Sequence, residues 1–108
     1  MSFNINEIAS DMLSAIKGAV ADNWDEVKTT SLQFLQRRKE RLQLLAELRI
    51  SGELSQEKFE SRLSDEKLIV EAELNALAVI SKAIAQKAAN AAIDVLVKAV
   101  NTAIKTAL

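Results

Sequence analysis

The basic run QRRKER, at residues 36–41, is the place where side-chain types and spacing most directly suggest chemistry. It supplies four cations, Arg37, Arg38, Lys39 and Arg41. Because such cations neutralise phosphates, one hypothesis is a contact with RNA or DNA. Glu40 interrupts the run and no aromatic side chain is interleaved. We therefore favour a solvated helix face, which a chain reversal near residue 52 would place opposite Asp65 and Glu66.

The residue types that usually carry catalysis are missing. The sequence contains no His, Cys or Tyr, which removes the common general base near neutral pH, the thiolate nucleophile and the usual nitrogen and sulfur ligands of metals. Glu66, Glu71 and Glu73 are close in sequence, but a helix places 71 and 73 on different faces, and we interpret all three as a solvated polar face. No Gly-rich phosphate loop is present. We expect no enzymatic activity, no metal and no cofactor.

Composition predicts a single all-α domain over residues 1–108. Hydrophobic residues make up 49% of the chain, which argues against wholesale disorder, while aromatic residues make up only 4%. Ala, Leu, Ile, Glu, Lys and Ser dominate, and most of these lose little conformational freedom in a helix. The formal net charge is −1, so no global field attracts nucleic acid or an anionic membrane.

The first arm of the predicted fold covers residues 5–50 and contains one ambiguous point. Asn4 or Asn6 can cap a helix whose apolar positions recur every three or four residues. Asn23 begins a capping-box pattern, which is compatible with a new helix there. No Gly or Pro separates the two segments, so we favour a kink or a continuous helix over a true turn. We expect Trp24, the single Trp, to fill the core where the arm bends.

The clearest chain reversal lies at residues 51–54. Gly52 enters the left-handed conformation without steric cost and so ends the first arm, and Ser55 can cap the next helix. From there to about residue 106 no Gly or Pro intervenes, so the second arm, residues 55–106, is predicted to be one long helix. The two arms then form an antiparallel hairpin about 70 Å long.

The two chain ends carry more apolar helix surface than a lone hairpin can cover. In residues 76–108 the charged side chains form a narrow stripe beside a broad, Ala-rich face, and residues 5–20 have a similarly broad apolar face. Soluble monomers rarely expose such a patch, so we predict that hairpins assemble into a helical bundle. The candidate oligomer interface consists of Ile8, Met12, Ile16, Ile84, Ala88, Ala91, Val95, Leu96 and Val100.

Three kinds of partner fit this surface. A second copy, giving a homo-oligomer, is favoured over another helical protein. Lipid is the alternative from a different class, since a broad apolar face above a Lys-rich stripe is also typical of membrane-surface or pore-forming helices. Lys82, Lys87 and Lys98 interrupt every window of about 20 residues, so no conventional transmembrane helix is predicted. The sequence thus predicts a non-enzymatic interaction protein, with a nucleic-acid binder as the third hypothesis.

The N-terminal residues resemble no targeting segment. Glu7 and Asp11 precede any basic residue, and no continuous apolar run follows them. Secretion signals and transit peptides have the opposite charge pattern. We therefore expect a cytoplasmic location.

Overall fold

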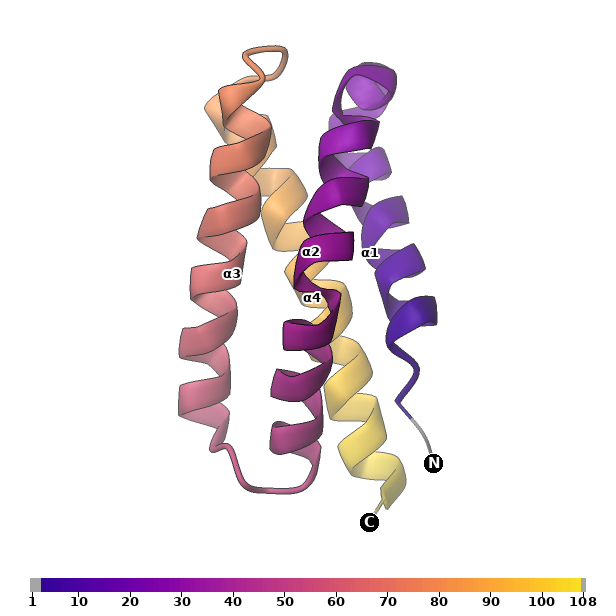
Figure 1. Ribbon diagram of the computed structural model, residues 1–108, viewed down its shortest axis with the longest axis vertical. Helices are drawn as coiled ribbons and strands as arrows, with labels where there is room; N and C mark the ends of the chain where they lie inside the picture. Colours follow the sequence, from indigo (N-terminus) through magenta and orange to yellow (C-terminus); the bar gives the residue numbers. More distant parts are fainter. Residues whose placement is uncertain (1–2, 108) are drawn as a thin grey trace.

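The structure is a computed structural model that describes residues 3–107, and these residues form an up-down-up-down bundle of four α-helices without strands (Figure 1). The helices are α1 (Ile5–Val20), α2 (Trp24–Ile50), α3 (Gln56–Ala76) and α4 (Lys82–Ala107), with a 3₁₀ turn, η1 (Ala21–Asn23), between the first two. The all-α helical bundle predicted from the sequence is confirmed.

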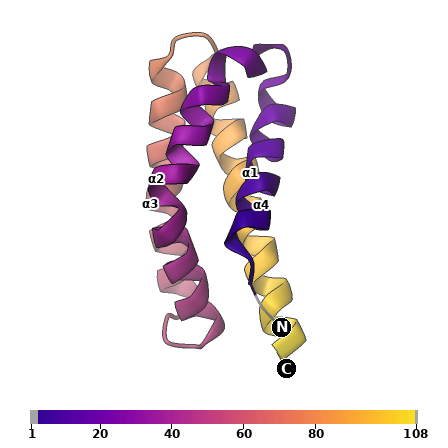
Figure 2. The same cartoon turned by 45° about the vertical axis from the view of Figure 1, so that its right-hand side comes forward.

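Two antiparallel helix pairs make up the bundle. The terminal pair consists of α1 and α4, which share the most extensive helix–helix contact, and the central pair consists of α2 and α3. Both views place the chain ends and the α2–α3 turn at one end of the bundle and the other two connections at the opposite end (Figures 1 and 2). The first arm therefore does lie beside the second, but the hairpin is folded back on itself.

Both arms are interrupted where the hairpin folds back. In the first arm, η1 separates α1 from α2, so a new helix does begin after Asn23. In the second arm, residues 77–81 interrupt the stretch 55–106, and the prediction of one long helix there is wrong. The longest dimension of the molecule is consequently 43 Å instead of the expected length of about 70 Å.

The break in the second arm has a local cause that involves neither Gly nor Pro. Val79 and Ile80 are β-branched, which lowers their helix propensity. The Oγ of Ser81 accepts a hydrogen bond from the backbone N–H of Ile84 at 3.1 Å and so caps the start of α4. Ala78 adopts a φ of 58° where the chain reverses. The available sequence signal was Ser81, a typical N-cap residue ahead of a run of good helix formers.

Asn4 and Ser55 cap the starts of α1 and α3, and Gly52 follows the end of α2, as the sequence predicts. The Oδ1 of Asn4 accepts from the backbone N–H of Asn6 at 3.0 Å, which starts α1. The Oγ of Ser55 accepts from the backbone N–H of Lys58 at 3.2 Å, which starts α3. Gly52 has a φ of 84°, a left-handed conformation that favours Gly over residues with a Cβ.

The core passes through all four helices. Its fully buried side chains include Met12, Ile16, Phe34, Leu42, Phe59, Leu63, Leu74, Leu96 and Val100. Among the described residues, the large apolar side chains that remain exposed are Leu44 and Leu68. Folding the terminal pair onto the central pair thus covers the apolar surface that was expected to stay open on a lone chain. No helix within residues 3–107 has both the length and the apolar character needed to cross a bilayer.

Candidate functional site

A buried carboxylate on α3 engages the basic run of α2. Glu66 is only 1% exposed. Arg38 holds both of its oxygens, with Nε donating to Oε1 at 2.8 Å and Nη2 donating to Oε2 at 2.5 Å. The Nε of Arg41 donates to Oε2 of the same carboxylate at 3.3 Å. Because two parallel hydrogen bonds are strongly directional, this contact aligns α2 with α3.

The charge of Arg38 and the burial of Glu66 depend on each other. The hydrogen bond to Glu66 raises the pKa of Arg38 above its ordinary value, burial opposes this rise, and the charges of Glu66 and Glu73 add to it. The Arg38 side chain is 29% exposed and that of Arg41 46%. Water therefore reaches both cations, whereas the carboxylate depends on them for its compensation.

The other two cations of the basic run also have partners in the fold. Arg37 forms an ion pair with Glu73. The Nζ of Lys39 donates to Oδ1 of Asn6 on α1 at 3.0 Å. Each of the four residues predicted to contact phosphate thus already has an acceptor within the chain, and binding a phosphate would compete with that acceptor.

The position of Glu66 corrects the sequence interpretation of the acidic residues. A solvated face is wrong for Glu66, although Glu71 and Glu73 are partly exposed. Asp65, the other expected partner of the basic run, is exposed and forms no ion pair among the described residues. Spacing could have identified the buried position, because Glu66 belongs to the series Phe59, Leu63, Glu66, Val70 and Leu74.

The residues predicted to form an oligomer interface lie between the helices of one chain. Five are buried in the core, namely Met12, Ile16, Ala88, Leu96 and Val100. Four are half-buried, namely Ile8, Ile84, Ala91 and Val95. Neighbouring helices of the same chain cover this surface. An interface that uses the five buried residues therefore requires the bundle to open.

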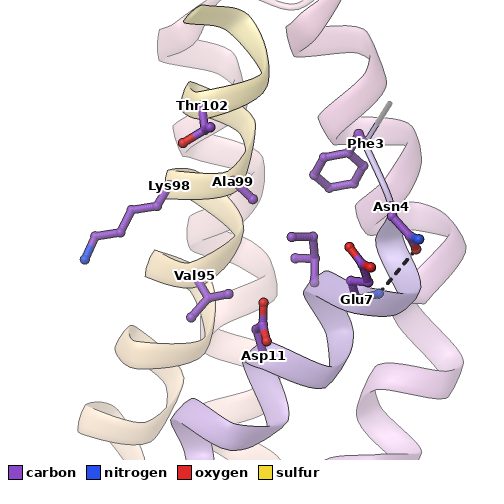
Figure 3. Close-up of a pocket in the computed structure, with 9 residues that line it drawn as sticks. Phe3, Asn4, Glu7, Asp11, Val95, Lys98, Ala99 and Thr102 are labelled. Carbon is purple, nitrogen blue, oxygen red and sulfur yellow. Dashed lines mark hydrogen bonds between the residues drawn. The ribbon is translucent and has the colours of Figure 1, made fainter. Parts of the chain in front are cut away.

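Open grooves flank α1 on both sides. The groove toward α4 has a volume of about 460 Å³ (Figure 3). Its lining residues are Phe3, Asn4, Glu7, Ile8, Asp11, Val95, Lys98, Ala99 and Thr102. Figure 3 shows the Lys98 side chain extending away from α1, so its ammonium does not close the groove. The groove toward α2, which Leu13 and Leu32 help to line, has a volume of about 270 Å³.

Neither groove brings together the side chains that catalysis or metal binding would need. Glu7 and Asp11 lie one helical turn apart on α1, and Glu7 is in the first turn, where an acidic residue is favoured by the partial positive charge of the helix N-terminus. Among residues 3–107, no three acidic side chains come together as the ligands of a metal ion would. The grooves are therefore best understood as the edges of helix packing.

Comparisons with known proteins found no relative. No protein-family model matches the chain, and neither a curated protein nor a solved structure matches it. The observations that bear on function are therefore those of the fold itself. They are the ion cluster of the central pair, in which Glu66 binds Arg38 and Arg41, and the Ala-rich surface of the terminal pair.

Proposed function

We propose that the protein is a non-enzymatic helical interaction protein that pairs its helices with those of a second copy. The Ala-rich face of α4 carries the proposal. Ala85, Ala88, Ala89 and Ala92 have no exposed surface, and small side chains let a neighbouring helix approach closely. In one chain, α1 is the main neighbour of α4. In the proposed assembly, helices from two copies cover the same faces.

The contacts within the bundle favour this proposal over nucleic-acid binding and over a membrane-surface role. The cations of the basic run face carboxylates and an amide, so a nucleic acid would have to displace partners that are already in place. The apolar face of α4 lies inside the bundle, so a membrane-surface role would also require opening, and it would leave the helix faces without their helical partners. A cytoplasmic location is part of the proposal.

The test is the solution mass measured by light scattering over a wide range of protein concentration. We expect a dimer or larger species whose population rises with concentration. A species with the mass of one chain at every concentration contradicts the proposal. Co-sedimentation with anionic liposomes provides the second arm, in which vesicle binding by a protein that stays monomeric favours the membrane alternative.

A further inference from the structure

The terminal and central pairs share one register. In the central pair, the residue numbers of Arg38–Glu66, Arg41–Glu66 and Arg37–Glu73 add to 104, 107 and 110. In the terminal pair, Asp11 lies beside Val95 in the groove of Figure 3, and these numbers add to 106, within the same range. One antiparallel alignment therefore extends from the α2–α3 turn to the chain ends. The bundle is therefore one long hairpin whose two arms both bend back on themselves, at η1 and at residues 77–81.

The buried face of the hairpin also continues through both folds. Val20 and Val27 are buried on either side of η1 and are seven residues apart. Leu74 and Ala88 are buried on either side of the second fold and are fourteen residues apart. Multiples of seven return a helical position to nearly the same face. If α1 ran straight into α2, and α3 into α4, the core residues would still share one face.

Each fold holds an alanine in a backbone conformation that residues with a Cβ rarely adopt. Ala21 has a φ of 51° and a ψ of −116°, and Ala78 has a φ of 58°. The Cβ disfavours positive φ, and most such positions in proteins are occupied by Gly. The chain contains no Pro, so neither fold has a residue that forbids a helix. Straightening would relieve both alanines.

From these three observations we infer that the chain exchanges halves with a second copy. In the exchanged dimer both folds straighten and each chain becomes a long hairpin. The terminal pair of one chain then packs on the central pair of the other, and every contact between the two pairs is recreated between chains. This inference rests on the self-association proposed above and specifies its form.

A second copy is the partner that matches an opened hairpin. Opening uncovers the core face along both pairs, including Phe34, Phe59 and Leu96. That face also carries Glu66, which is 1% exposed in the closed chain, and a lipid surface would have to accommodate this carboxylate and its arginines. The other copy presents the packing partners that the closed chain already uses.

Proximity of α1 to α2 distinguishes the closed chain from the exchanged dimer. The Lys39 Nζ and the Asn6 Oδ1 are 3.0 Å apart in the closed chain. In a straightened helix the two residues, 33 apart in sequence, would be separated by about 50 Å. The sequence has no Cys, so Asn6→Cys chains and Lys39→Cys chains can be refolded together and treated with a short bismaleimide. We expect a covalent dimer that joins position 6 of one chain to position 39 of the other.

Contacts within each helix pair provide matched controls. Arg37 and Glu73 pair within the central pair, and Asp11 lies beside Val95 in the terminal pair. Both contacts stay within one chain after exchange. Mixtures of Arg37→Cys with Glu73→Cys chains, or of Asp11→Cys with Val95→Cys chains, should therefore give no covalent dimer. Linkage between chains at the control positions contradicts exchange of whole hairpin halves.

The outcomes separate this inference from the proposed function. If light scattering shows a dimer but positions 6 and 39 cross-link only within one chain, in the variant Asn6→Cys/Lys39→Cys, the exchange is wrong and self-association stands. If every sample has the mass of one chain, the exchange and the self-association are both wrong.

Variants at the two alanines test whether the folds straighten. The variant Ala21→Gly/Ala78→Gly favours the closed chain, because Gly accepts positive φ and weakens a continuous helix, and we expect its dimer to dissociate at least about tenfold more readily. The variant Ala21→Val/Ala78→Val should shift the equilibrium toward the dimer, since a β-branched residue tolerates positive φ poorly. Equal dimer populations in both variants contradict the straightening.

Discussion

The two helix pairs of this bundle are held together by different interactions. The terminal pair packs apolar side chains such as Met12 and Leu96 around the alanines of α4, and apolar attraction has no preferred direction. The central pair also buries apolar residues, but it adds the two-point contact between Arg38 and Glu66. A buried ion pair contributes more to alignment than to stability. We infer that the ion pair selects the register of the central pair. Close packing of apolar side chains then extends this register through the terminal pair.

The largest effect should come from the apolar half. Leu96→Ala removes a fully buried side chain of α4, and we expect it to lower the free energy of unfolding by about 2–5 kcal/mol, as measured by urea denaturation. The control is Leu68→Ala on α3, where the residue is 57% exposed and a change below about 0.5 kcal/mol is expected. Equal effects of the two substitutions would show that apolar packing does not hold the terminal pair.

Breaking the ion cluster should have the next largest effect. Arg38→Ala leaves the buried carboxylate of Glu66 with Arg41 as its partner at 3.3 Å, and we expect a loss of about 3 kcal/mol in the free energy of unfolding, measured in urea. The exposed Arg62→Ala is the matched control and should change stability by less than about 0.5 kcal/mol. A loss no greater than that of the control would mean that Glu66 is compensated without Arg38.

Replacing both members of the ion pair should cost less than breaking it. The variant Arg38→Met/Glu66→Leu removes the buried charge together with its partner, and we expect a stability within about 1 kcal/mol of the original chain. Urea denaturation of the double variant beside Arg38→Ala measures the difference. If the double variant is as unstable as the single one, the pair stabilises the fold directly and its role is not limited to alignment.

The smallest effects should come from the two glycines, and they should have opposite signs. A Cβ added at Gly18 or at Gly52 would meet no atom within 4 Å, so backbone conformation decides. Gly18 lies within α1, and Gly18→Ala should stabilise the chain by about 0.5–1 kcal/mol. Gly52 has a φ of +84°, and Gly52→Ala should destabilise it by about 1 kcal/mol. Thermal unfolding followed by circular dichroism measures both, and changes of the same sign would contradict the assigned conformations.

The sequence was sufficient to predict the all-α class, the central turn and the pairing of the arms, but not the division of the second arm into α3 and α4. Asn4, Gly52 and Ser55 have types and positions whose local physics is specific, and the structure uses each as predicted. Asn23 is used differently. Its Nδ2 donates to Oε1 of Glu26 at 3.0 Å, while no side-chain cap of the backbone forms. Asn23 and Glu26 therefore contact each other through their side chains, and Asn23 does not cap the backbone as the capping-box motif would require.

The spacing of the core residues did not predict that the hairpin folds on itself, although Asn23 and Ser81 were local signals of a helix start. The spacing of core residues continues through both folds, as at Val20 and Val27, and a continuous spacing indicates a straight helix. Tertiary packing overrides it, because burying the faces of α1 and α4 within one chain outweighs the roughly 1–2 kcal/mol that each positive-φ alanine costs. The burial of Glu66, in contrast, was readable from its place between Leu63 and Val70.

The lone Trp gives the unmodified protein its own optical reporter. Trp24 begins α2 directly after η1, is half-buried, and lines a shallow depression with Leu13 and Lys17 of α1. When α1 swings away, the indole loses the cover that Leu13 and Lys17 of α1 provide and meets more water, so its emission should move to longer wavelength. Stopped-flow fluorescence can then time the opening in a chain that carries no label and no mutation.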